Sequence, residues 1–141
     1  MTHEVHDTVS FDALPHELVD TLFMKAGVVV DIPEQFNFSV AIVTDKEIQP
    51  MNKQYRGKDY PTDVLSFRYD EYSGEIVLSA DRIRAQAEEF GHTPTVEAAF
   101  MLVHGILHIM GWDHERSEKE AKEMRQLEHQ ILRQCGLAFA R

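Results

Sequence analysis

A chain of 141 residues, 43% of them hydrophobic, is long enough to bury a core without disulfides, and we expect one domain over residues 1–141. It has no run of about 18 apolar residues and no basic and apolar leader, and its single cysteine suits a reducing compartment. We therefore expect a cytoplasmic protein with no membrane partner, and the formal net charge of −10 argues against a protein that coats nucleic acid nonspecifically.

The first third of the chain carries two strand patterns and one helix pattern. Residues 5–11 alternate loosely between apolar and polar side chains and predict a first strand. Pro15 suits the first turn of a helix that continues to about Gly27. Residues 37–44 alternate more strictly, which makes them the clearest strand of the sequence.

The next helix has two candidate starting points. Thr44 and Glu47 have the spacing of a capping box, in which each side chain binds the other residue's backbone amide, so a helix is expected to begin there. Pro50 would lie inside that helix, where a proline removes a backbone hydrogen bond. The alternative is a helix that begins at Gln49 and carries Pro50 in its first turn.

The middle of the chain predicts a hairpin followed by a helix. Residues 64–69 and 75–79 have strand patterns, and the loop of residues 70–74 between them is typical of a hairpin. Residues 80–90 predict a helix, which Gly91 closes.

Two further helices complete the chain. Thr93 and Pro94 suit the N-cap and first helical position of a central helix that is apolar on most faces. Ser117 with Glu120 predicts a second capping box, and the last helix stops at Gly136. The order of elements predicts an α+β fold, with a single mixed sheet of about four strands and helices packed over it.

The central helix and the turn that ends it carry three histidines. His104 and His108 are one turn apart and therefore point to the same side of the helix. Gly111 can take the left-handed conformation that closes a helix, so the chain turns back and His114 can meet the other two from outside. Three imidazoles in this arrangement predict a site for one divalent metal ion, best matched by Zn²⁺, on the central helix and its exit turn.

The histidine spacing is that of the metzincin signature H-E-x-x-H-x-x-G-x-x-H, except that Gly105 stands where those proteases have a glutamate base. A single histidine on an apolar helix is usually packed in the core, but three at these offsets around a glycine favour a metal. A closed structural site needs a fourth ligand, and the only cysteine, Cys135, lies far along the next helix. We therefore predict an open site that keeps one position for water.

Two carboxylates are candidates for supporting the metal ligands. Asp113 lies beside His114, where it can hold an imidazole in one tautomer or can simply satisfy the amides of a turn, and the sequence favours neither. Glu97 lies two turns before His104 on the same stripe of the helix. It could stand behind a ligand, but glutamates in a first turn commonly favour the helix dipole, which is the interpretation we prefer.

Basic residues gather in one window of the chain. Residues 46–68 contain five basic and three acidic residues, a net charge of +2, which leaves −12 for the remainder. This predicts either a local basic patch or an ordinary solvated loop. Arg56 lies in this window, and a guanidinium fork suits phosphate, but spacing alone gives this arginine no special role.

Three stretches resemble one protein family. Residues 104–114, H-G-I-L-H-I-M-G-W-D-H, closely resemble the H-G-x-L-H-L-x-G-Y-D-H signature of the YbeY family, bacterial metal-dependent endoribonucleases that mature ribosomal RNA. Residues 51–67, M-N-K-Q-Y-R-G-K-D-Y-P-T-D-V-L-S-F, resemble that family's second block, and residues 74–79, G-E-I-V-L-S, its third. Trp112 stands where tyrosine is usual and Ile109 replaces leucine, but neither departure removes a metal ligand.

The resemblance implies roles for particular residues. His104, His108 and His114 match the family's zinc ligands, and Arg56 matches the arginine of its active cleft, which makes Arg56 our candidate for catalytic phosphate binding. It also implies an α+β fold and single-strand-specific RNA cleavage in 16S ribosomal RNA 3′-end maturation and ribosome quality control. The expected partners are single-stranded RNA, ribosomal RNA and ribosomal small-subunit proteins, and no DNA.

Two functions from different classes stay open at this point. The first is a metal-dependent endoribonuclease, whose nucleophile is either metal-bound hydroxide or the RNA 2′-hydroxyl. The alternative is a ribosome-assembly binding factor with a structural metal, which would unfold when the metal is removed. A metalloprotease is disfavoured by Gly105, because peptide hydrolysis at such sites uses the missing glutamate as its base.

Overall fold

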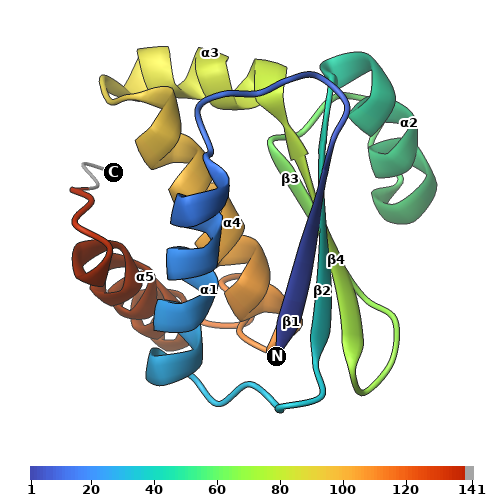
Figure 1. Ribbon diagram of the computed structural model, residues 1–141. Coiled ribbons are helices and arrows are strands. Elements are labelled where there is room, and N and C mark those ends of the chain that lie inside the picture. The colour runs from blue at the N-terminus through green and yellow to red at the C-terminus, as the bar shows by residue number, and fades with distance from the viewer. Residues whose placement is uncertain (139–141) are drawn as a thin grey trace.

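The strands form one mixed sheet in the order β1-β2-β4-β3 (Figure 1). In this computed structural model, which describes residues 1–138, β1 (Thr2–Asp7), β2 (Asn37–Val43) and β4 (Ser73–Ser79) run parallel. β3 (Val64–Arg68) pairs with β4 in the antiparallel direction. The predicted α+β class and four-stranded mixed sheet are confirmed.

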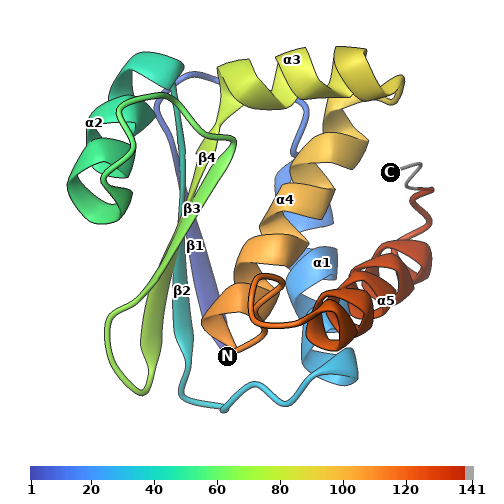
Figure 2. The ribbon, with the colours of Figure 1, turned by 180° about the vertical axis from the view of Figure 1, so that it is seen from behind.

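The helices cover the two faces of the sheet unequally. They are α1 (His16–Val29), α2 (Asp45–Arg56), α3 (Ala80–Phe90), α4 (Pro94–Ile109) and α5 (Glu118–Gln134). α1 and α4 lie on one side of the sheet with α5 beyond them, whereas α2 lies on the other side (Figures 1 and 2). Over residues 1–138, no helix has the length and apolar character needed to cross a membrane.

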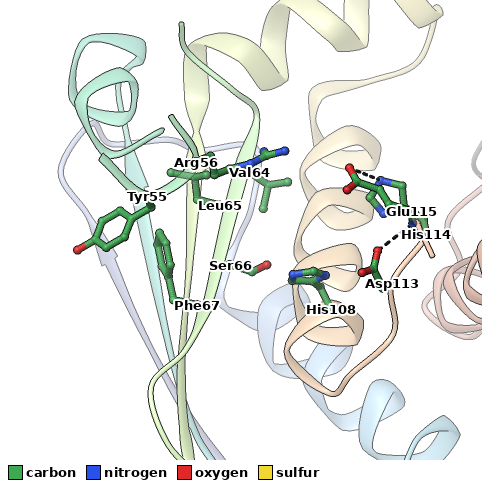
Figure 3. Close-up of a pocket in the computed structure, with 10 residues that line it drawn as sticks. All are labelled: Tyr55, Arg56, Val64, Leu65, Ser66, Phe67, His108, Asp113, His114 and Glu115. Carbon is green, nitrogen blue, oxygen red and sulfur yellow. Dashed lines mark hydrogen bonds and ion pairs between the residues drawn. The ribbon is translucent and has the colours of Figure 1, made fainter. Parts of the chain in front are cut away.

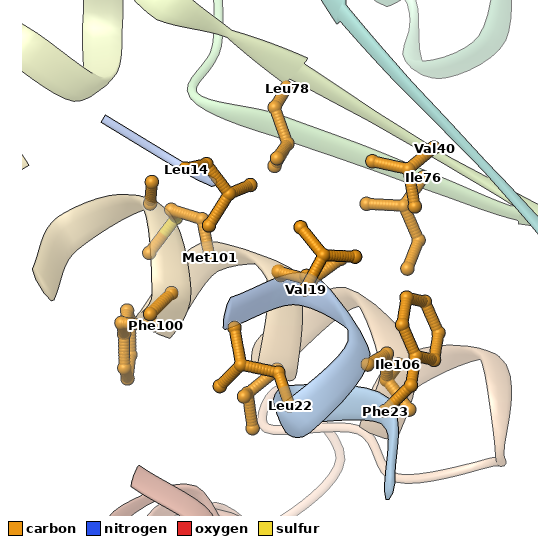
Figure 4. Packing of buried hydrophobic residues seen from close by; sticks show 14 of the residues in the cluster. Leu14, Val19, Leu22, Phe23, Val40, Ile76, Leu78, Phe100, Met101 and Ile106 are labelled. Atoms are coloured by element: carbon orange, nitrogen blue, oxygen red, sulfur yellow. The ribbon is translucent and has the colours of Figure 1, made fainter. Parts of the chain in front are cut away.

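α4 runs through the hydrophobic core. Its residues Phe100, Met101 and Ile106 form one cluster with Phe23 of α1 and Ile76 of β4 (Figure 4). A second, smaller cluster lies between α2 and the opposite face of the sheet and consists of Val43, Ile48, Leu65 and Val77. α4 is therefore held by packing on most of its faces, while His108, near its C-terminal end, is exposed.

The first strand differs most from its prediction. β1 begins at Thr2 and ends at Asp7 instead of spanning residues 5–11. The Asp7 carboxylate accepts the backbone amides of Val9 at 2.9 Å and Phe11 at 2.7 Å, which turns the chain away from the sheet. Phe11 lies outside the strand and is buried in the core, so this apolar residue was not part of a strand alternation.

The capping box at the start of α2 is confirmed. The Thr44 hydroxyl accepts the Glu47 amide and the Glu47 carboxylate accepts the Thr44 amide, both at 3.2 Å. The alternative start at Gln49 is therefore wrong. Pro50 lies inside the helix at an exposed position and does not end it, because the capped first turn is already formed before the proline.

Candidate active site

The exit of α4 has the geometry predicted from its glycine. Gly111 has φ of +102°, in the left-handed region. Its amide donates to the His108 carbonyl and the Trp112 amide donates to the Leu107 carbonyl, both at 3.0 Å, which are the paired bonds of a Schellman motif. The chain therefore reverses directly after α4 and returns His114 toward the helix.

The exit turn is fastened to the start of α5. Ser117 caps α5 by accepting the Glu120 amide at 3.1 Å, as predicted. The second half of the predicted capping box is wrong, because the Glu120 carboxylate accepts the Asp113 amide at 3.1 Å and pairs with Arg116. Arg116 also donates to the Gly111 carbonyl at 2.7 Å. Glu120 and Arg116 together hold the turn between the two helices.

His104 is oriented by an acid that the sequence reasoning missed. Its Nδ1 lies 2.7 Å from Oε2 of Glu128 on α5, whose side chain is almost fully buried. A carboxylate partner favours the tautomer with a proton on Nδ1, which leaves the Nε2 lone pair for a metal. A signal was present in the sequence, since Glu128 interrupts an apolar stripe of α5 that includes Met124, Ile131 and Leu132.

His108 and His114 complete the histidine group. The rings of His104 and His114 are 5.1 Å apart between centroids. The ring of His108 is open to solvent on one side but partly desolvated, and this desolvation, followed by the neighbouring His104, lowers the pKa of His108 and favours its neutral, ligand-competent form. The three imidazoles are too far apart in this conformation to share one ion. Over residues 1–138, no three His, Cys, Asp or Glu side chains are grouped closely enough to hold an ion. His114 Nε2 lies instead 3.8 Å from Glu115 Oε1.

The chemistry of the three histidines nevertheless suits a zinc-like ion. Imidazole nitrogen is a common ligand of Zn²⁺, and a carboxylate behind a ligating imidazole, as Glu128 stands behind His104, is its usual support. His104, His108 and His114 are the residues that would hold the ion, after side-chain rotation brings them together. The metal site therefore stays a prediction.

A cavity of about 390 Å³ opens in front of the histidines (Figure 3). One wall carries His108 on α4 and His114 on the exit turn. The opposite wall carries Arg56 at the end of α2 and several neighbours, namely Tyr55, Val64, Leu65, Ser66 and Phe67. Figure 3 shows the Arg56 side chain directed toward the wall that carries His114. The fold thus brings together an arginine and two histidines that lie far apart in the sequence.

The basic window of residues 46–68 does not form one patch. Arg56 lines the cavity, whereas Lys53 pairs with Asp59 at 3.8 Å on the exposed surface. Arg68 donates to the Ile109 carbonyl at 3.1 Å and so ties β3 to the end of α4. The structure singles out Arg56 by its place in the cavity.

Asp113 and Glu97 lie in different environments. Asp113 lines the cavity with His108, and its Oδ1 accepts the Glu115 amide at 2.8 Å, a bond that lowers the pKa of this carboxyl. It is therefore a turn residue that also lies beside the histidines. Glu97 is fully buried, and its Oε1 lies 2.6 Å from His92 Nε2, so this acid is more than a helix-dipole residue.

Gly105 marks the place where β4 packs directly against α4. A Cβ atom at residue 105 would lie 2.9 Å from Cγ2 of Ile76, closer than Cβ atoms are found in proteins. Ile76 is fully buried and has little room to move aside. The glycine is therefore explained by close packing, and a side chain at residue 105 would be directed into the sheet and not into the cavity.

The chain matches known proteins over most of its length. A family model described as Endoribonuclease YbeY matches residues 3–136. A protein named Endoribonuclease YbeY from Bacillus licheniformis is 40% identical over 135 residues, 85% of each chain. One from Chloroflexus aurantiacus is 39% identical over 134 residues, 86% of this chain and 87% of the relative. The solution structure of TM1509 from Thermotoga maritima has a TM-score of 0.63 at 28% identity, covering 93% of this chain and 89% of that one.

The family model and the relatives that match this chain define a class of proteins named as endoribonucleases. The solved structure that matches shares the fold described above. The family model spans nearly all of the chain, and the relatives are similar to it along most of their own length. This chain belongs to the Endoribonuclease YbeY family. The resemblance seen in the three sequence blocks is confirmed.

Proposed function

We propose that this protein is a metal-dependent endoribonuclease that cleaves single-stranded RNA. One observation carries the proposal: Arg56 and the histidines His108 and His114 line opposite walls of a single cavity, in a chain of the YbeY family. A guanidinium fork binds phosphate oxygens, and a histidine cluster binds a divalent ion. The two together are suited to a phosphodiester placed between the walls.

The two walls have separate tasks in this mechanism. Arg56 binds the oxygens of the scissile phosphate and offsets the negative charge that builds up in the transition state. His104, oriented by Glu128, would hold one divalent ion together with His108 and His114, and Zn²⁺ is our candidate. When bound, such an ion would supply Lewis-acid chemistry for phosphodiester cleavage.

The aromatic residues beside Arg56 support a preference for single strands. Tyr55 is 60% exposed, its ring lies 4.7 Å from that of Phe67 between centroids, and both line the cavity. An unpaired base can stack on such a ring, whereas a base inside a duplex already has both faces covered. RNA that is single-stranded around the scissile phosphate therefore gains a contact that duplex RNA lacks.

The family membership supports ribosomal RNA as the substrate class. We infer that the protein acts in the cytoplasm in 16S ribosomal RNA 3′-end maturation and ribosome quality control, together with ribosomal small-subunit proteins. The formal charge of −10 supports contact with RNA through a limited surface and not through a general coating.

The test combines metal analysis with an RNA cleavage assay. Protein purified without a nickel column should carry close to one divalent ion per chain. It should cleave a single-stranded RNA faster than the same sequence in a duplex. A chelator should stop cleavage, and added Zn²⁺ should restore it. A metal-loaded protein that leaves single-stranded RNA intact would overturn the proposal.

The alternative, a ribosome-assembly binding factor with a structural metal, makes a different prediction. α4 is buried by apolar side chains on most of its faces, and this packing does not depend on an ion. We therefore expect the chelated protein to keep its helical circular dichroism while it loses cleavage. Unfolding on chelation would favour the binding factor.

A further inference from the structure

α5 carries a row of basic side chains along one face. Lys122, Arg125, His129 and Arg133 follow one another at intervals of three and four residues, so they stand above one another on the helix. Together with Gln126 they line a shallow hollow of about 400 Å³. We name these four basic residues the α5 stripe. It extends about 16 Å along the helix axis, at about 1.5 Å per residue.

Arg125 connects the α5 stripe to the histidines. It lines a second cavity, of about 410 Å³, together with His104 and His114. This arginine also lies one turn before Glu128, the acid that orients His104. The second cavity shares Val64 and His114 with the cavity that contains Arg56. The α5 stripe and Arg56 therefore approach the same site from different sides.

Three residues of the α5 stripe keep their charges outside salt bridges. Within residues 1–138, Lys122, Arg125 and Arg133 form no ion pair, although all three are exposed. Arg116, in the turn just before the same helix, is by contrast paired with Glu120. A row of exposed cations on a protein whose formal charge is −10 attracts a polyanion locally.

We propose that the α5 stripe binds the phosphate backbone of RNA that extends beyond the cleavage site, on the side away from Arg56. This inference rests on the proposed endoribonuclease function and gives its substrate a path. The strand crosses the histidine site and continues along α5, which Figure 2 shows running outward from the exit turn of α4. Phosphate contacts carry no base information, so the α5 stripe adds affinity for RNA of any sequence long enough to reach it.

The experiment compares the salt dependence of binding between variants. A fluorescent 2′-O-methylated RNA strand, checked by gel electrophoresis to stay intact, is titrated with wild-type protein and with the triple variant Lys122→Gln/Arg125→Gln/Arg133→Gln at several salt concentrations. Loss of three phosphate contacts should reduce the slope of log affinity against log salt by about 2, since each contact to a single strand contributes about 0.7. In cleavage assays, KM should rise while kcat changes little.

Two controls separate phosphate binding from general effects. Lys46→Gln removes one exposed charge at the start of α2 and should leave the slope unchanged. Arg125→Lys/Arg133→Lys keeps the charges and should keep the wild-type slope, which excludes a disturbed α5 as the cause. A triple variant with the wild-type slope and KM would overturn the inference and assign the α5 stripe to another ligand, such as an acidic protein surface.

The salt dependence of RNA binding can be measured whether or not the protein cleaves RNA, so this test is separate from the test of the nuclease function. A protein that binds the RNA with the expected salt dependence but never cleaves RNA contradicts the nuclease function alone. A protein that cleaves RNA and shows no change of slope in the triple variant contradicts the α5 stripe alone.

Discussion

The two walls of the histidine cavity are built in different ways. The α4 wall belongs to the core, with Gly105 pressed against Ile76 and His104 backed by the buried Glu128. The Arg56 wall lies at the surface, where α2 ends at Gly57 with φ of +72°. Metal ligands tolerate little displacement, whereas a substrate wall must admit a large RNA. We therefore expect changes in the first wall to alter metal binding and stability, and changes in the second to alter RNA cleavage alone.

The largest expected effect is on the α4 wall. His108→Ala removes one of the three proposed metal ligands, so the purified protein should lose most of its metal and its RNA cleavage. Elemental analysis and a cleavage assay measure both. His16→Ala, an exposed histidine on α1, is the matched control and should retain wild-type metal content. Near-stoichiometric metal in the His108 variant would contradict the ligand assignment.

Arg56→Ala should impair RNA cleavage without affecting metal binding or stability, and so distinguish the roles of the two walls. Metal content and thermal unfolding should stay at the wild-type level, while cleavage falls by about 100-fold or more, the usual effect of removing a group that stabilises transition-state charge. Arg56→Lys should recover only part of the rate, because an ammonium group cannot reproduce the planar fork. Full activity of the alanine variant would place Arg56 outside the reaction.

Glu128→Gln tests whether the acid behind His104 supports the metal. The glutamine has nearly the same size but lacks the charge that makes the imidazole a better ligand, so metal affinity should fall by about 10-fold. Competition with a chelator of known affinity measures the change. Glu123→Gln, on the same helix, should show no loss. Equal affinities in the two variants would remove Glu128 from the metal site.

Gly105→Ala should destabilise the protein although alanine is the better helix former. Overpacking against Ile76 costs about 1–3 kcal/mol, while the helix propensity gained is at most about 1 kcal/mol. Denaturant unfolding measures the free energy. Ile76→Ala should reduce the penalty in the double variant, because it removes Cγ2, Cγ1 and Cδ1, the three atoms nearest the new Cβ atom. A more stable Gly105→Ala protein would disprove the packing explanation.

The smallest expected effect concerns base stacking on the Arg56 wall. Tyr55→Ala should raise KM for single-stranded RNA about fivefold and leave kcat unchanged, in line with about 1 kcal/mol for one stacked base. Tyr72→Ala serves as the control, because Tyr72 is an exposed tyrosine directly before β4 and does not line the cavity. Equal KM values for the two variants would exclude a stacking role for Tyr55.

Features encoded by neighbouring residues could be predicted from the sequence. The shared face of His104 and His108 follows from helix periodicity, and the reversal after α4 follows from Gly111. The N-cap Thr93 is confirmed in the same way, because a cap is a bond within four residues.

Features that depend on packing between distant elements could not be predicted. Glu128 contacts His104 only because α5 packs against α4. The position of Glu128 in the sequence does not indicate which residue it contacts. Glu120 fits the capping-box pattern, but Arg116 and the Asp113 amide compete successfully for its carboxylate. Arg56 was identified by family resemblance, since no local pattern indicates that the end of α2 faces the histidines.

Gly105 also limits the evolutionary routes open to this site. A glutamate at residue 105 would complete the metzincin signature in the histidine segment. Its Cβ atom would collide with Ile76, and its carboxylate would be directed toward the apolar face of the sheet. The substitution Gly105→Glu therefore produces a destabilised protein and not a protease. The two enzyme classes share a motif but are separated by a stability barrier, and repacking of β4 would have to precede any exchange of chemistry.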